Sequence, residues 1–154
     1  MRPVDHVLRV FTDADGRFGN FLGMFLDTGD WTDEFCQSRA HDLGFSETVF
    51  VDDIRTGRIR IFTPTVKLGF AGHPTVGAAW LIDHLGHEVH TLECEVGTVY
   101  SVATQLGATV LADPAWSPPI DLTQVASPEV VDSYRPWEGS HEYVWAWIDE
   151  ARGI

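Results

Sequence analysis

Short apolar runs, separated by turn-forming residues, recur along the first 112 residues and predict a chain rich in strands. The expected strands cover residues 7–12, 21–26, 46–51, 58–63, 89–96, 98–104 and 108–111. The first two flank a turn rich in Asp and Gly, so they are expected to form a hairpin. In the fourth strand arginine and isoleucine alternate, which predicts that one face of that strand meets water.

Two segments carry helix signals instead. Residues 33–43 follow N-cap candidates and stop at Gly44, a residue type that commonly ends helices. The second helix is expected to start near Pro74, because the N–H that proline lacks has no intrahelical partner in the first turn, and to end at Gly86. It has almost no polar face, so strands should surround it. The order of elements predicts an α+β fold, with a mixed or antiparallel sheet wrapped around a central helix.

The composition changes at Asp113, where a proline-rich stretch begins that reads as a linker or long loop. Between residues 113 and 150, eight acidic residues stand against one basic residue, Arg135. A short helix is expected over 127–134 and a strand over 142–148. The expected organisation is a lobe over 1–112, a linker or acidic segment over 113–140 and the start of a further unit over 141–154.

The chain has 154 residues and a formal net charge of -13, so it is long enough for a real core and strongly acidic. This acidity opposes binding to nucleic acids and to anionic membranes. No apolar run is long enough to cross a bilayer, and the charged N-terminus does not resemble a signal peptide, so a cytoplasmic location is expected. An anionic small-molecule substrate would have to be held by local amides or dipoles.

The segment from Gly69 to Trp80 offers such a place. It places Gly72 and His73 at the N-terminus of the apolar helix, where free amides and the helix dipole favour a carboxylate-bearing ligand. Glu47 lies upstream, at the start of a predicted strand. A carboxyl group partly shielded from water can both accept and return a proton near neutral pH. These residues suggest proton transfer on a small carboxylic or amino acid.

Three blocks of the sequence form a pattern in this order. The first block is Val10-Phe11-Thr12 followed by Gly19-Asn20, the second is Ser46-Glu47, and the third runs from Arg60 to Trp80 with Phe-Ala-Gly-His-Pro-Thr at its centre. These blocks resemble the first half of the PhzF-like isomerases of phenazine biosynthesis, whose lobes share the diaminopimelate epimerase fold. The resemblance spans roughly residues 4 to 112.

This resemblance implies a cofactor-independent isomerase in which Glu47 is the general acid and base. It implies that His73 hydrogen-bonds the substrate or tunes Glu47, and that Asn20, Ser46 and Gly72 contact the substrate. In the family this chemistry resembles the isomerisation of a dihydro-hydroxyanthranilate.

Other chemistries have weaker support. His84, His87 and His90 have metal-like spacing, but Gly86 breaks the helix between the first two and the third is expected on a strand, so no metal site is expected. Cys36 and Cys94 are far apart, and neither falls where the thiols of the related two-cysteine racemases would lie. Neither a Gly-x-Ser-x-Gly hydrolase motif nor a dinucleotide fingerprint is present in the sequence.

The resemblance stops before the second lobe, whose acidic residue and Gly-Ser turn have no match in the sequence. The chain is then a truncated product, or a lobe completed by a partner chain, or a lobe retained for binding alone; a homodimer is also plausible. The alternative function is therefore a non-catalytic module that binds a small acid or another protein.

Overall fold

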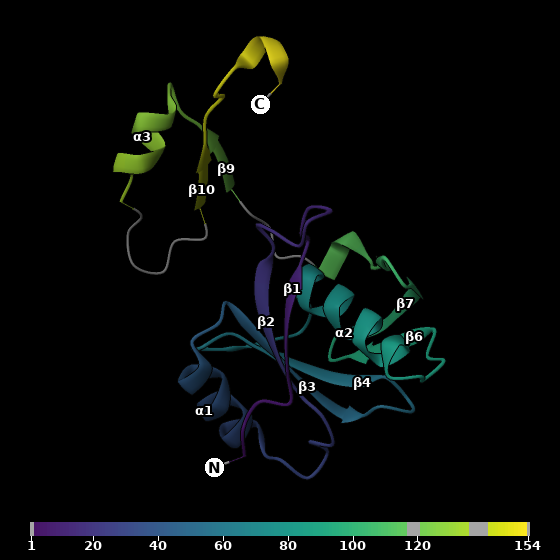
Figure 1. The fold of residues 1–154 in the computed structure, drawn as a ribbon. Helices are drawn as coiled ribbons and strands as arrows, with labels where there is room; N and C mark the ends of the chain where they lie inside the picture. The colour runs from purple at the N-terminus through teal and green to yellow at the C-terminus, as the bar shows by residue number, and fades with distance from the viewer. Residues whose placement is uncertain (1, 117–120, 136–141, 154) are drawn as a thin grey trace. The chain divides into compact units, whose positions relative to one another are not determined.

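A computed structural model describes residues 2–116, 121–135 and 142–153 of the chain (Figure 1). The chain divides into two compact units, residues 1–116 and residues 117–154. The described residues contain no helix that is both long and apolar enough to span a membrane.

The described residues of the first unit form eight strands, two α-helices and a short 3-10 helix. The strands are β1 His6–Val10, β2 Asn20–Phe25, β3 Glu47–Asp53, β4 Arg58–Phe62, β5 Lys67–Leu68, β6 Thr91–Cys94, β7 Gly97–Thr104 and β8 Gly107–Leu111. The helices are α1 Asp33–Leu43, α2 Gly72–His84 and η1 Pro114–Trp116. Apart from the two-residue β5, each of these strands and both α-helices match an expected element to within a few residues.

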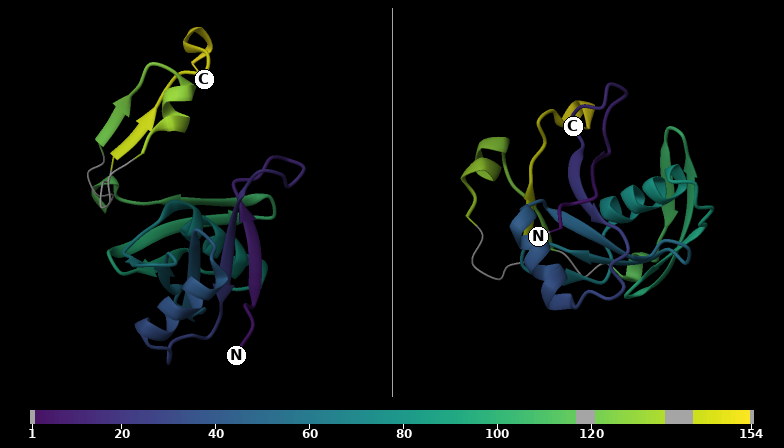
Figure 2. Two further views of the ribbon diagram at one scale, coloured as in Figure 1. Left: turned by 90° about the vertical axis from the view of Figure 1, so that its left-hand side faces the viewer. Right: turned by 60° about the horizontal axis from the view of Figure 1, so that its bottom comes forward.

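The strands form one mixed sheet in the order β1-β2-β3-β4-β6-β7-β8, with β5 paired to β4. The predicted hairpin of β1 and β2 is present and antiparallel, whereas β2 and β3 run parallel, with Leu22 beside Glu47. The sheet curves around α2 as a half-barrel (Figure 2). The structure therefore confirms the expected α+β fold with strands around one apolar helix.

Two apolar clusters hold this arrangement together. On the inner side of the sheet, α2 packs against inward-facing side chains such as Leu22, Val49 and Ile61, all at most 1 % exposed. On the outer side, α1 covers three phenylalanines, Phe25, Phe50 and Phe62. Burial of apolar area on both faces fixes the sheet between the two helices.

The capping residues of α1 and the first turn of α2 account for where these two helices begin and end. Thr32 caps α1 by accepting a hydrogen bond from the N–H of Phe35, and Gly44 ends it in the left-handed conformation, as expected. Helix α2 begins at Gly72, two residues before the expected start at Pro74. Since none of the first amides of a helix has an intrahelical partner, proline is tolerated throughout the first turn and does not define its first residue.

The second unit contains β9 Asp121–Gln124, α3 Pro128–Ser133, β10 Glu142–Trp145 and η2 Glu150–Arg152. Strands β9 and β10 pair in parallel, and α3 connects them as a crossover. The short helix expected over 127–134 is present. Residues 121–133, within the segment expected to be a linker or acidic segment, form β9 and α3 of this unit. The linker residues 117–120 and 136–141 lie outside the described residues.

Candidate active site

Three chain segments place the predicted site residues at the ends of regular elements. Asn20 begins β2, Glu47 begins β3 directly after Ser46, and Gly72 and His73 open α2. The left-handed Gly44, whose N–H donates to the carbonyl of Ala40, ends α1 and lets the chain turn into β3. Because β2 and β3 are parallel neighbours, Asn20 and Ser46 lie at the same end of these two strands.

The carboxylate of Glu47 faces the imidazole of His73. Oε2 of Glu47 lies 3.4 Å from Nε2 of His73, and the two side chains are only 19 % and 12 % exposed. Both atoms are buried, and among the described residues neither has a hydrogen-bond partner. Because an unsatisfied buried polar atom costs roughly 1–3 kcal/mol, folding alone does not favour this arrangement. Two such atoms facing each other are typical of a site that a ligand completes.

The protonation of His73 follows from its surroundings. Burial lowers the pKa of His73 below its ordinary value of 6.5, and the negative charge of Glu47 opposes this effect without outweighing it. His73 is therefore a neutral imidazole at neutral pH. A neutral imidazole has one donor and one acceptor nitrogen, so His73 can hydrogen-bond a ligand without being an ionic partner of Glu47.

The first turn of α2 leaves its amides unused. The N-cap Ala71 makes no side-chain capping bond. Within the described part of the chain, the N–H groups of Gly72 and His73 donate no hydrogen bond. The apolar α2 also has no acidic residue in its first turn to neutralise the positive end of its dipole. A side chain at Gly72 would meet nothing within 4 Å, so there is room for a ligand to approach this backbone.

Asn20 and Ser46 contact each other. Nδ2 of Asn20 donates a hydrogen bond of 2.9 Å to Oγ of Ser46, and both residues are exposed. The bond joins the start of β2 to the residue before Glu47. The structure thus forms two pairs, Asn20 with Ser46 and Glu47 with His73, and the consecutive Ser46 and Glu47 connect them.

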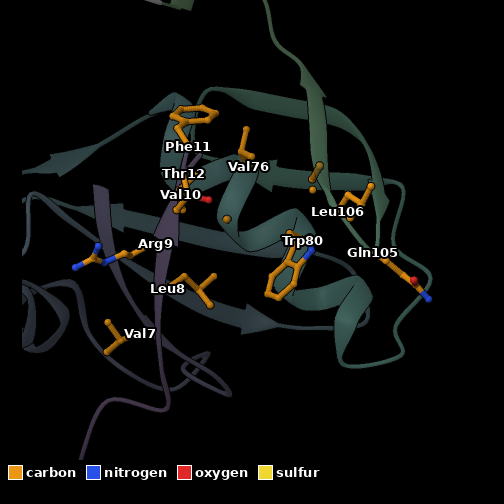
Figure 3. Close-up of a pocket in the computed structure, with 13 residues that line it drawn as sticks. Val7, Leu8, Arg9, Val10, Phe11, Thr12, Val76, Trp80, Gln105 and Leu106 are labelled. Carbon is orange, nitrogen blue, oxygen red and sulfur yellow. The ribbon is translucent and has the colours of Figure 1, made fainter. Parts of the chain in front are cut away.

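A pocket of about 530 Å³ lies elsewhere on the first unit, between β1, α2 and the turn of the β7–β8 hairpin. Figure 3 shows Trp80 of α2 between Leu8 of β1 and Leu106 of the turn. Glu47 and His73 do not line it, but Val76, one helical turn after His73, does. Its lining comes from segments far apart in the sequence, so no local sequence signal could have predicted this pocket.

The remaining candidate groups are the two thiols and the spaced histidines. Burial raises the pKa of both thiols, Cys36 and Cys94, to about 11, so neither is a ready nucleophile. The described residues include no group of three metal-ligating side chains. His84 stacks on Trp80 with ring centroids 4.7 Å apart, while His90 lies in the loop before β6 and not on the strand that was expected there.

Sequence comparisons identify relatives of this chain. Residues 8–141 match the sequence pattern of a family described as "Phenazine biosynthesis-like protein". An uncharacterized isomerase of Pasteurella multocida is 34 % identical over 136 residues, which is 85 % of this chain and 44 % of that protein. A trans-2,3-dihydro-3-hydroxyanthranilate isomerase of Pseudomonas fluorescens is 34 % identical over 109 residues, 64 % of this chain and 39 % of that one.

Solved structures show the same likeness. A predicted epimerase of Pseudomonas aeruginosa superposes with a TM-score of 0.54 at 34 % identity, covering 66 % of this chain and 39 % of the other. A PhzF-family protein of Bacillus anthracis gives a TM-score of 0.55 at 28 % identity, covering 68 % and 38 %. The chain thus spans less than half the length of these relatives.

Proposed function

The chain belongs to the phenazine biosynthesis-like protein family, and we propose that it forms the proton-transferring lobe of a cofactor-independent isomerase. The substrate would be a small carboxylic or amino acid. The pair formed by Glu47 and His73 carries this proposal, because its two facing polar atoms are buried and without a hydrogen-bond partner among the described residues.

Glu47 is the proposed general acid and base. Its carboxylate would take a proton from one carbon of the substrate, the electron pair would shift through an adjacent double bond, and the carboxyl group would return the proton to another carbon. No net oxidation or reduction occurs, so the step needs no cofactor. General acid–base catalysis by a positioned carboxylate contributes typically 10²–10⁴-fold to a rate.

The other residues would hold the substrate. The amides of Gly72 and His73 at the start of α2 suit a carboxylate, which is the ligand that the positive end of a helix dipole favours. The neutral imidazole of His73 can bridge between Glu47 and a polar group of the substrate. Asn20 and Ser46 offer an amide and a hydroxyl beside Glu47 for a second polar group.

A second lobe would complete the cleft in front of Glu47. The relatives are more than twice as long as the region that matches this chain, which covers 44 % and 39 % of two of them. We expect the second lobe from further residues of the same polypeptide or from a partner chain, and we expect the protein to act in the cytoplasm. Closure by such a lobe would exclude water from the proton transfer.

A non-catalytic module that binds a small acid or another protein is the second candidate. Large exposed apolar side chains on β7 and β8 favour an interaction role for part of this surface. Measurements of turnover and of ligand binding distinguish this module from an isomerase.

Turnover and binding are measured on the same purified protein with its second lobe present, either in the longer polypeptide or from the partner chain. Isomerisation of trans-2,3-dihydro-3-hydroxyanthranilate, the substrate named for several relatives, is followed by NMR, and binding of anthranilate, a stable aromatic acid, is followed by calorimetry. Turnover supports the isomerase. Binding that shifts the amide signals of Gly72 and His73 without turnover supports the binding module, and the absence of both contradicts both functions.

A further inference from the structure

The loop between β1 and β2, residues 11–19, carries two exposed phenylalanines. Phe11 is 69 % exposed and directly follows β1, and Phe18 is 83 % exposed and lies two residues before Asn20, where β2 begins. A phenylalanine left in water forgoes the free energy that burial of its ring would contribute. Single exposed apolar side chains are common on proteins, so the backbone of this loop provides the stronger evidence for a function.

Both phenylalanines hold the left-handed backbone conformation. Phe11 has a φ of 63° and Phe18 a φ of 73°, and among the described residues only Asp27 and several glycines share a positive φ. This conformation is unfavourable for a bulky side chain, because its Cβ crowds the backbone. The same loop has a glycine where Gly16 adopts a φ of 75°. Strained residues cluster at functional sites, so the two rings indicate a role other than folding stability.

The loop that carries the two rings is well ordered by its own contacts. Asp13 accepts hydrogen bonds from the backbone N–H of Arg17 at 2.8 Å and from its Nε at 3.0 Å, and the N–H of Asp13 donates to the carbonyl of Arg17. A Cβ at Gly19 would lie 2.6 Å from Cγ2 of Thr12, so the two ends of the loop touch. The direction in which Phe18 leaves the backbone is therefore set before a ligand binds.

Both rings lie beside the candidate active site. Consecutive Cα atoms are 3.8 Å apart, so the Cα of Phe18 is within about 8 Å of the Cα of Asn20. Phe11 lines the same pocket as Val76, which lies one helical turn after His73 on α2 (Figure 3). The loop thus borders the site from the side of β1 and β2.

We infer that Phe11 and Phe18 are specificity-determining residues, and that they form an apolar wall against which the ring of a planar, cyclic carboxylic acid packs. This inference rests on the proposed function, in which the substrate binds at Glu47 and His73. The other groups proposed to hold the substrate are amides, an imidazole and a hydroxyl, which contact its polar atoms. The two phenylalanines supply the apolar contact that these groups lack.

The wall favours ring acids over open-chain acids. A flat six-membered ring offers the phenylalanines a face or an edge, and aromatic pairs pack with centroids about 4.5–7 Å apart. An open-chain acid of the same charge keeps its contacts with the helix amides but loses much of this packing. Binding should therefore discriminate between the two kinds of acid by roughly tenfold or more.

Calorimetric titration of the protein with its second lobe present tests the wall with two probes, benzoate and sorbate. Both acids are planar and have the same charge, but only benzoate has a ring. The wild type should bind benzoate at least about tenfold more tightly than sorbate, and Phe18→Ala and Phe11→Ala should each reduce this preference to less than about threefold. Phe35→Ala is the matched control, because Phe35 is an exposed phenylalanine of α1, on the outer side of the sheet, and it should keep the wild-type preference.

Thermal unfolding distinguishes a role in specificity from a structural role. Phe18→Gly accepts a φ of 73° without strain, so it should unfold at a higher temperature than Phe18→Ala and still lose the preference for benzoate. A merely structural role would make binding follow stability, so that Phe18→Gly would resemble the wild type more than Phe18→Ala does in both measurements.

A wild type without a preference for benzoate, or a Phe18→Ala or Phe11→Ala variant that keeps the preference, would overturn the inference. Turnover of trans-2,3-dihydro-3-hydroxyanthranilate by the same samples separates this failure from a failure of the proposed function. If the wild type isomerises this compound, the isomerase stands and only the wall is refuted. A wild type that neither turns over this compound nor binds either acid refutes both.

Discussion

Nε2 of His73 lies 3.4 Å from Oε2 of Glu47, at the point where the first turn of α2 meets the start of β3. A neutral imidazole and a carboxylate at this distance are close enough to share a hydrogen bond after a small shift. Since neither atom has a hydrogen bond among the described residues, both can form one with a group of a bound ligand.

The lowered pKa of His73 predicts how stability depends on pH. In the unfolded chain His73 takes up its proton near its ordinary pKa of 6.5, whereas in the folded chain burial delays protonation to lower pH. Between these two values the unfolded state binds more protons, so the free energy of unfolding falls as the pH falls below 6.5. Urea titrations of His73→Gln should show a flatter fall in this window.

The matched control for this prediction is His41→Gln, which removes an exposed histidine from the last turn of α1. It should keep the pH dependence of the wild type. An equally steep fall in His73→Gln and in the wild type would contradict the assignment of this proton to His73.

A nearly buried ion pair predicts a large loss of stability. Arg60 donates hydrogen bonds to both carboxylate oxygens of Asp52, and the side chains are 13 % and 9 % exposed. Arg60→Leu leaves the charge of Asp52 without its main partner and should lower the free energy of unfolding by about 3–5 kcal/mol. Lys67→Gln breaks the more exposed contact with Asp33 and should cost about 1 kcal/mol or less. Equal losses of unfolding free energy in Arg60→Leu and Lys67→Gln, measured by urea titration, would contradict this prediction.

Two glycines of α2 are expected to respond in opposite ways. A Cβ at Gly77 would lie 2.5 Å from Cδ2 of Leu22 and 2.9 Å from Cγ2 of Val10, so Gly77→Ala should cost about 1–3 kcal/mol through overpacking. A Cβ at Gly72 meets nothing within 4 Å, so Gly72→Ala should keep the stability of the wild type. If the ligand approaches this backbone, Gly72→Ala should weaken anthranilate binding about tenfold. Unchanged binding in Gly72→Ala would remove this residue from the proposed site.

Local signals allowed the sequence to predict much of the fold. The N-cap Thr32 and the left-handed Gly44 bound α1, and the apolar periodicity places α2 inside the sheet. The parallel pairing of β2 with β3 could not be predicted in this way, because register between distant strands depends on non-local packing. The hydrogen bond of Asn20 to Ser46 depends on that pairing, so only the family resemblance suggested both residues.

The Arg60–Asp52 pair and the pocket beside Trp80 were not anticipated for the same reason. Their partners come from separate elements, and neither residue type nor spacing indicates that they meet. By contrast, local features predict the positions of Glu47 and His73. Glu47 lies at the start of a strand that follows the end of a helix, and His73 lies at the N-terminus of a helix. Their approach to 3.4 Å is a property of the folded sheet and helix.

The rate of isomerisation in Glu47→Gln tests the central claim most directly. Trans-2,3-dihydro-3-hydroxyanthranilate is the substrate, and Glu88→Gln, which changes an exposed glutamate in the loop before β6, is the control. We predict that Glu47→Gln lowers the rate at least about 10³-fold while anthranilate binding stays within about threefold of the wild type. Glu88→Gln should match the wild type in both measurements. A Glu47→Gln variant that keeps more than about a tenth of the wild-type rate, both measured with the second lobe present, would contradict the account.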